Sequence, residues 1–286
     1  MCRLFGLLGN GVTPAEPWLL ETDRSLLNQS NVAAEEAQTD GWGIGWFNDR
    51  RGLNIERGIG GASSPSEVDE FRRAAKAAHG PLAIAHLRKA SNPMGLPKER
   101  LIALENSQPF AHGSTLFAHN GMIPFPRQTR ALLGEYESMV RGVNDSEVLF
   151  WLLVRHLDTA PGPVQAFDGV ITDLVRVWRD NGAPVGGPYS GLNVVFSRGP
   201  SELWAFCQYL GEHGTGLLDR TRPYYQMAYL SDAKQFVVGS EPFDSTRSDW
   251  RTLPNGHYLC AQAIHGLVAV TTGVLPAPSA PPRAVR

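Results

Sequence analysis

The stretch that decides the fold expected for this chain is its beginning, Met1-Cys2-Arg3-Leu4-Phe5-Gly6-Leu7-Leu8-Gly9. Side chains in an extended strand point alternately to opposite faces, so Cys2, Leu4, Gly6 and Leu8 share one face and the intervening residues share the other. The pattern predicts a strand that starts beside Cys2. Such a strand would hold Cys2 in place, whereas a free chain terminus frays.

The position of Cys2 directly after Met1 gives it a special chemical possibility. Because Cys is small, a methionine aminopeptidase can remove Met1, and Cys2 then carries a thiol and a free α-amine. The amine has an ordinary pKa of about 7.7–8.0 and the thiol about 8.5, so the amine can accept the thiol proton near neutral pH. Cys2 would then be a nucleophile with its own general base. The alternatives are an ordinary buried cysteine, or a retained Met1 that locks the amine in a peptide bond.

The composition excludes several classes of protein. The 286 residues, 42% hydrophobic and 19% charged, are typical of a soluble globular protein with one large domain or two small ones. A net charge of −2 predicts no broad attraction to nucleic acid or to an anionic membrane. The three cysteines cannot all form disulfides, and we see no signal peptide and no apolar run of 18 residues, so we expect a cytoplasmic protein.

Common motifs for zinc, nucleotide and serine-hydrolase chemistry are also missing from the sequence. These are C-x-x-C, H-E-x-x-H, G-x-x-x-x-G-K-[ST] and G-x-S-x-G. We therefore expect neither a metal nor a cofactor.

The pattern of elements along the chain predicts an α+β fold with two sheets. In residues 42–46, Gly43 and Gly45 alternate with larger residues, which predicts a strand that another backbone or a ligand can approach closely, or a weakened strand under a helix. Helices are predicted at 17–28, from the capping box Ser64-Pro65-Ser66-Glu67 to Gly80, and at 127–139, 144–157 and 164–179. Further strands are predicted at 53–57, 82–87, 115–118, 192–197, 202–208, 225–230, 235–238, 257–261 and 267–271.

No internal repeat or linker divides the chain. We therefore expect one domain over residues 2–273, followed by a proline-rich, disordered tail at 274–286.

Three further stretches place polar groups at the ends of predicted elements. Arg88 follows a predicted strand and could grip a carboxylate with two hydrogen bonds, or it could be a surface residue. Asn120 and Gly121 could form an oxyanion hole, although Asn-Gly is also a common hairpin turn. Asp145 could bind an ammonium group, or it could simply interact with the dipole at a helix N-terminus.

A polar loop, Glu105-Asn106-Ser107-Gln108-Pro109, precedes the strand that carries Asn120. Taken alone, this loop predicts only a turn.

In this order, the motifs resemble the class II glutamine amidotransferases of the N-terminal-nucleophile hydrolase superfamily. The resemblance covers most of residues 2–150 and continues more loosely beyond them. It rests on Cys after Met, His86-Leu87-Arg88, Glu105-Asn106-x-x-Pro109, His119-Asn120-Gly121 and Asp145-Ser146-Glu147. The family fold it implies is a four-layer αββα sandwich of two antiparallel sheets.

The resemblance also implies roles for individual residues. Cys2 would be the nucleophile and its amine the base, and Asn120 and Gly121 would form the oxyanion hole. Arg88 would hold the α-carboxylate of glutamine and Asp145 its α-ammonium. Asn106 and Ser107 match a loop near the substrate pocket.

Two departures place the chain in the small, stand-alone branch of the family. Lys89-Ala90-Ser91-Asn92 follows Arg88, where large synthase-linked members have Trp-Ala-Thr-His, and Asp40-Gly41-Trp42-Gly43 replaces their early Arg-Gly segment. Some relatives in that branch cleave other γ-glutamyl amides, in an ergothioneine pathway and in glutathione degradation.

We therefore expect a cysteine amidohydrolase that acts on glutamine or a related γ-glutamyl compound through a thioester on Cys2. The alternatives are a glutaminase subunit that passes ammonia to a separate synthase chain, and a γ-glutamyl-binding subunit without activity.

Overall fold

Two antiparallel sheets form the centre of the computed structural model, which describes residues 2–32 and 35–276. The first sheet has the order β11-β9-β10-β1-β4-β2-β3 and the second the order β13-β12-β8-β7-β6-β5. The strands of the first are β1 (Arg3–Pro14), β2 (Trp42–Phe47), β3 (Leu53–Gly58), β4 (His79–Leu87), β9 (Met227–Ser231), β10 (Gln235–Gly239) and β11 (Arg251–Leu253). Those of the second are β5 (Phe110–His112), β6 (Thr115–Gly121), β7 (Leu192–Arg198), β8 (Glu202–Cys207), β12 (His257–Ile264) and β13 (Leu267–Val274).

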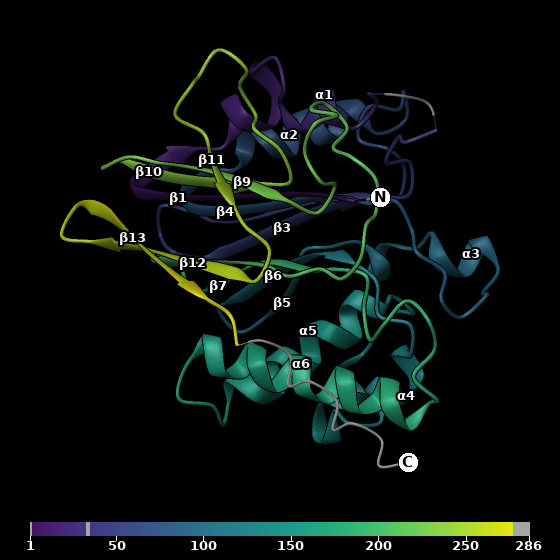
Figure 1. The fold of residues 1–286 in the computed structure, drawn as a ribbon. Helices are drawn as coiled ribbons and strands as arrows, with labels where there is room; N and C mark the ends of the chain where they lie inside the picture. Colours follow the sequence, from purple (N-terminus) through teal and green to yellow (C-terminus); the bar gives the residue numbers. More distant parts are fainter. Residues whose placement is uncertain (1, 33–34, 277–286) are drawn as a thin grey trace.

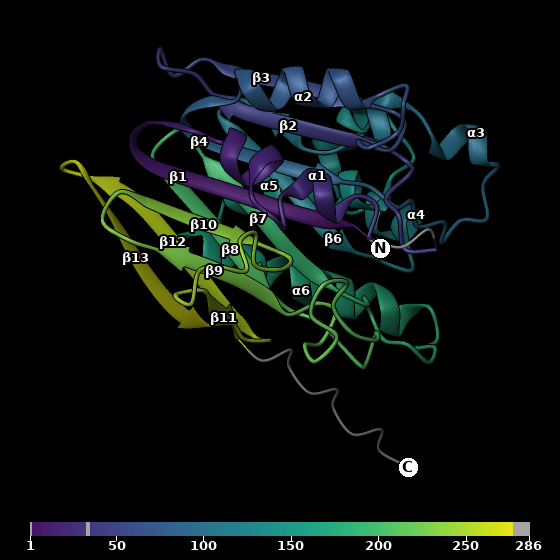
Figure 2. The ribbon, with the colours of Figure 1, turned by 90° about the horizontal axis from the view of Figure 1, so that it is seen from above.

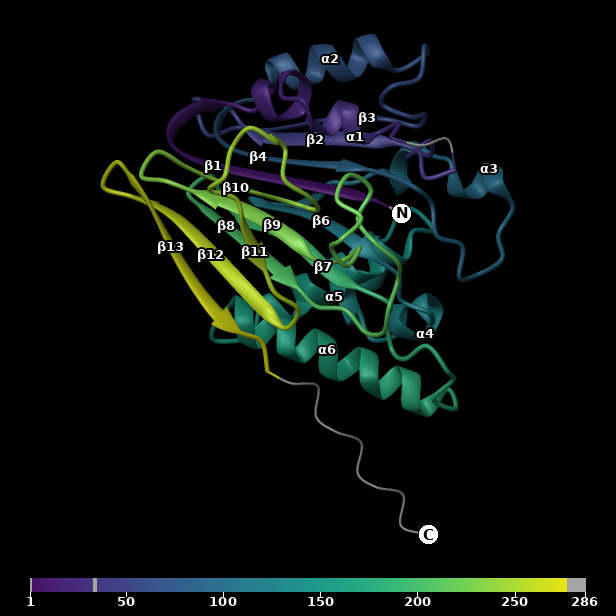
Figure 3. The same cartoon turned by 45° about the horizontal axis from the view of Figure 1, so that its top comes forward.

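Helices cover the outer face of each sheet, so the molecule has four layers in the order α, β, β, α (Figures 1 and 3). A π-helical turn (Pro17–Glu21), α1 (Leu26–Gln29) and α2 (Val68–Ala77) lie over the first sheet (Figure 2), and α5 (Asp145–Leu157) and α6 (Pro163–Asp180) over the second (Figure 1). The remaining helical segments are α3 (Lys98–Leu101), α4 (Pro126–Arg130) and the 3₁₀ turns Leu104–Asn106 and Gly134–Met139. The predicted four-layer αββα fold is confirmed.

The alternation predicted for the first strand is also confirmed. β1 lies between β10 and β4, well inside its sheet. Leu4 and Leu8 are buried between the two sheets, whereas Phe5 and Leu7 are buried between the first sheet and its helices. This double burial fixes the strand and with it the position of Cys2 at the strand's start.

The close approach predicted at the glycines of β2 is present. A Cβ atom built on Gly43 would lie 2.1 Å from the carbonyl oxygen of Gln108, so only glycine fits there. The loop before β5 therefore packs directly on the backbone of β2.

The capping box predicted at Ser64 is wrong. α2 begins at Val68, and the Glu67 carboxylate accepts hydrogen bonds from Trp42 Nε1 at 2.8 Å and from the Gly60 N–H at 3.3 Å. A capping box requires the Glu67 side chain to accept from the N–H of Ser64, but here it forms tertiary hydrogen bonds instead. Gly80 does not close this helix either, because the helix ends at Ala77 and Gly80 lies in β4.

The single helix predicted at residues 127–139 is divided in the structure. α4 ends at Arg130, and a 3₁₀ turn starts at Gly134, whose φ of 60° is outside the helical region. The helix predicted from 144 is confirmed, with the Asn144 side chain accepting from the Ser146 N–H at 2.9 Å.

The other predicted strands are present within a few residues of their predicted ends. Three-residue β5 and β11 were not predicted, because so few residues carry little alternation. The folded domain extends beyond residue 273, where its end was predicted, because Val274 belongs to β13 and Leu275 is 3% exposed. The rest of the expected tail, from 277, lies outside the described residues. No helix in the described ranges is long and apolar enough to span a membrane.

Candidate active site

A cavity of about 700 Å³ opens where β1 begins, at the end of the sheets marked N in Figure 1. Cys2 lies in its lining. One side, which we call the strand wall, consists of residues that follow β4 and end β6: Ser91, Asn120, Gly121 and Met122. The other side, the loop wall, consists of Glu36 and residues of the β8–β9 connection, chiefly His213, Thr215, Leu217, Arg220, Tyr224 and Tyr225.

Cys2 is half-buried and held by backbone contacts. Its Sγ lies 3.5 Å from both the N–H and the carbonyl oxygen of Lys89, and its own carbonyl accepts a 2.9 Å hydrogen bond from the Tyr224 hydroxyl. Burial raises the pKa of the Cys2 thiol, against smaller lowering effects of the Lys89 N–H and the Arg88 cation. The thiol therefore needs a base close by to become a nucleophile.

The Asn120 side chain places a buried amide at the cavity. The residue is 2% exposed, and its Nδ2 is buried without a hydrogen-bond partner of normal geometry among the described residues. The Asn120 side chain also interacts with the Tyr224 hydroxyl. Burial raises the pKa of Tyr224, and this interaction lowers it by a smaller amount. A buried donor without a well-formed hydrogen bond costs folding free energy, so the Asn120 amide marks a place where a ligand's acceptor atom can bind.

The hairpin-turn alternative for Asn120 and Gly121 is wrong. Both residues end β6 and pair with β7, Asn120 opposite Asn193 and Gly121 opposite Leu192. The strand fixes their backbone at the cavity.

Asp145 places a buried carboxyl next to the strand wall. It is 3% exposed, and it accepts from the Ser91 hydroxyl at 3.1 Å and the Ile123 N–H at 3.0 Å, but it makes no ion pair with a described residue. Burial raises the pKa of its carboxyl. Asp145 does not line the cavity itself, but Ser91 connects it to the strand wall.

Next to this carboxylate, His119 is a neutral imidazole. Its Nε2 lies 3.0 Å from the carbonyl oxygen of Gly191, so Nε2 carries the proton and Nδ1 accepts from Ser146 Oγ at 2.9 Å. Burial lowers the pKa of His119, so the residue does not neutralise Asp145.

Arg88 lies behind the strand wall, 3% exposed and outside the cavity lining. Both of its hydrogen bonds come from one nitrogen, Nη1, which donates to the carbonyls of Leu101 at 2.8 Å and Asp40 at 3.1 Å. Burial lowers the pKa of Arg88, while Cys2, Asp40 and Asp145 raise it, so the guanidinium is electrostatically coupled to both site residues.

Asn106 and Ser107 do not line the cavity. The Asn106 side chain donates to the carbonyls of Arg100 and Leu101 and accepts from the Val143 N–H at 2.7 Å. Ser107 Oγ donates to the Gly58 carbonyl at 3.1 Å. Asn106 therefore braces the segment before Asp145, whereas Ser107 contacts the end of β3, and a role of either residue near the substrate stays a prediction.

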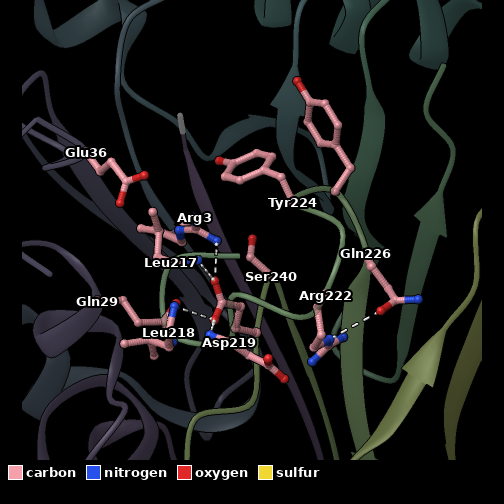
Figure 4. A network of polar contacts seen from close by, with 12 residues as sticks. Arg3, Gln29, Glu36, Leu217, Leu218, Asp219, Arg222, Tyr224, Gln226 and Ser240 are labelled. Atoms are coloured by element: carbon pink, nitrogen blue, oxygen red, sulfur yellow. Dashed lines mark hydrogen bonds and ion pairs between the residues drawn. The ribbon is translucent and has the colours of Figure 1, made fainter. Parts of the chain in front are cut away.

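The loop wall and its anchor, Glu241, were not predicted from the sequence; Figure 4 labels the anchor's hydrogen-bond donors, Arg3 and residues 217–219. The buried Glu241 carboxylate accepts from the N–H groups of Leu217, Leu218 and Asp219, and from Arg3 Nη1 at 3.3 Å. The Arg3 guanidinium also lies 4.8 Å from the centre of the Tyr224 ring. One signal was available: Arg3 is a charged residue in an otherwise apolar buried strand, and such a residue needs a partner.

No group of His, Cys, Asp and Glu side chains within residues 2–32 and 35–276 is arranged to hold a metal ion.

The family follows from the comparison with protein-family models. Residues 1–263 match the model described as glutamine amidotransferases class-II. The chain belongs to the class II glutamine amidotransferase family, whose members act on the side-chain amide of glutamine.

Solved structures show the same fold at low sequence identity. A class II glutamine amidotransferase domain protein from Silicibacter pomeroyi is 20% identical with a TM-score of 0.62, and the match covers 96% of this chain and 100% of that one. Glutamine phosphoribosylpyrophosphate amidotransferase from B. subtilis is 18% identical with a TM-score of 0.59, and the match covers 94% of this chain but 49% of that one. The fold is that of the N-terminal-nucleophile hydrolases. A comparison with curated proteins found no match.

Proposed function

We propose that this protein hydrolyses the side-chain amide of glutamine, or of a related γ-glutamyl compound, through a thioester on Cys2. One observation carries the proposal: the Cys2 thiol and the buried Asn120 amide share one cavity, and the Asp145 carboxyl, which forms no ion pair with a described residue, lies behind its wall. A nucleophile, an oxyanion donor and an anion for an ammonium group are what this reaction requires.

The reaction begins with Cys2 as the first residue of the mature chain. Its α-amine takes the thiol proton, and the thiolate attacks the γ-carbonyl carbon. The Asn120 amide and the Gly121 N–H donate to the oxyanion of the tetrahedral intermediate. The ammonium of Cys2 then protonates the leaving nitrogen, the carbon–nitrogen bond breaks, and ammonia or an amine departs. Water cleaves the thioester, which gives the γ-carboxylic acid and restores the thiol.

Arg88 and Asp145 select the amino-acid end of the substrate. Arg88 has nitrogens other than Nη1 for the α-carboxylate, and Asp145 provides the negative charge for the α-ammonium. Holding both groups fixes the γ-carbonyl at Cys2, which lowers the entropic cost of the attack.

A pair of cysteine variants tests the proposal. Cys2→Ala should lower kcat for release of ammonia from glutamine by at least about 10⁴-fold, the scale seen when a catalytic nucleophile is lost. Cys260→Ala, the same change at a cysteine outside the cavity, should leave kcat unchanged. Glutamine turnover by Cys2→Ala at the wild-type rate would sink the proposal.

A further inference from the structure

The cavity is larger than glutamine needs. Glutamine has about ten non-hydrogen atoms, and even at the roughly 30 Å³ that a whole water molecule occupies in the liquid they would fill at most about 300 Å³. The cavity holds about 700 Å³. The proposed contacts of the glutamyl part all lie on the strand wall or behind it, so the unfilled space borders the loop wall. A substituent on the amide nitrogen of the substrate would lie in this unfilled space beside the loop wall.

The charged side chains that line the cavity are two cations and one anion. Arg220 and Glu36 belong to the loop wall, and Lys89, which follows β4, lines the cavity on the other side. Arg220 forms a two-pronged ion pair with Glu36, at 2.8 and 3.1 Å, with side-chain exposures of 53% and 37%. Exposed pairs of this kind contribute little to stability, so a carboxylate on a ligand can replace Glu36 at small cost. The net positive charge favours an anionic ligand.

The backbone beside Arg220 is fixed, so its guanidinium is presented from a rigid position. The N–H groups of the three preceding residues, 217–219, all donate to the buried Glu241, which Arg3 also contacts (Figure 4). Asp219 Oδ1 in turn accepts from the Thr221 N–H at 3.0 Å. A guanidinium on a fixed loop suits recognition of a carboxylate, because its donors form a planar fork.

We propose that the loop wall is a subsite for an anionic substituent on the amide nitrogen, with Arg220 as the residue that binds it. The preferred substrates are then γ-glutamyl amides of amino acids, which rests on the proposed function of Cys2. The chemistry is unchanged: the carbon–nitrogen bond breaks, the departing amino acid takes the proton from the Cys2 ammonium, and water hydrolyses the thioester.

Three substrates separate this subsite from the rest of the reaction. Glutamine has no substituent, γ-glutamylglycine has an anionic one, and γ-glutamylglycinamide has a neutral one of nearly the same size. Wild-type protein should show a kcat/KM for γ-glutamylglycine at least about tenfold above that for the glycinamide, as expected for one charged hydrogen-bonded contact. Arg220→Gln should bring the two values close together, and Glu36→Gln should widen their difference.

Arg247→Gln is the matched control, since Arg247 forms a similar exposed ion pair with Asp249 outside the cavity. It should leave the preference unchanged. Equal kcat/KM values for the anionic and neutral substrates in wild-type protein, or an equal loss for all three substrates in Arg220→Gln, would overturn the subsite. Turnover of glutamine alone would also overturn it while leaving the proposed function intact, whereas no turnover of any substrate would contradict both.

Discussion

The two walls of the Cys2 cavity are built in different ways. The strand wall is formed where β4 and β6 end. The groups behind it, Arg88 and Asp145, are each 3% exposed. The loop wall belongs mainly to the long β8–β9 connection, in which the buried Glu241 carboxylate accepts from three successive N–H groups, and its Arg220 side chain is exposed. We propose that the two walls have different roles: the strand wall carries the chemistry, and the loop wall adapts the site to a substrate.

The largest effect expected from this comparison is on the stability of the loop wall's anchor. Glu241→Ala leaves the buried Arg3 without its ion-pair partner and three N–H groups without an acceptor, so the free energy of unfolding should fall by about 3–5 kcal/mol. Urea denaturation measures this loss. Asp249→Ala, which removes an exposed partner of Arg247, should change stability little. Equal effects of the two changes would mean that Glu241 is not the anchor.

On the strand wall, the largest effect expected is at Asn120. Asn120→Ala removes a donor to the oxyanion, so kcat for glutamine should fall by roughly 10²–10³-fold while KM changes little. Steady-state kinetics with glutamine separate the two constants. A change in KM alone would assign Asn120 to binding instead of transition-state stabilisation.

Arg88 tests whether the group behind the strand wall recognises the α-carboxylate. Arg88→Ala should lower kcat/KM for glutamine more than for γ-aminobutyramide, which lacks that carboxylate. The difference between the two losses of transition-state stabilisation should be about 2 kcal/mol. The comparison of two substrates cancels any loss of structure, which matters because Arg88 also holds the Leu101 and Asp40 carbonyls. Equal losses for both substrates would give Arg88 a purely structural role. Arg88→Lys should also be impaired, because an ammonium cannot form the planar fork.

The smallest effect expected is a pH dependence of binding that comes from Asp145. Burial raises the pKa of this carboxyl, and only its ionised form attracts the α-ammonium. The KM for glutamine should therefore rise as the pH falls through that raised pKa, and Asp145→Asn should abolish the trend. Glutaramate, which lacks the α-amine, should show no such rise, and a similar rise with it would point to another titrating group.

How much of the molecule the sequence predicts depends on how local the cause is. The alternation in β1 and the close approach at Gly43 follow from neighbouring residues, and both are confirmed. The start of α2 does not follow from neighbouring residues, because Glu67 accepts a hydrogen bond from Trp42, which is 25 residues away in the sequence.

The same distinction applies to the site. Motifs at strand ends led to Cys2, Asn120, Arg88 and Asp145, which the structure brings to or behind one cavity wall. They did not lead to the loop wall, because Glu241 and Arg3, which position it, are 238 residues apart.

A removable N-terminal extension tests whether the α-amine of Cys2 is the base. The protein would be made with a tag whose protease cuts immediately before Cys2, and glutamine hydrolysis would be measured before and after cleavage, with mass spectrometry to verify the N-terminal residue. We expect a folded but inactive tagged protein that gains activity on cleavage, because only then is the amine free. Full activity in the verified uncleaved protein would contradict this role of the amine.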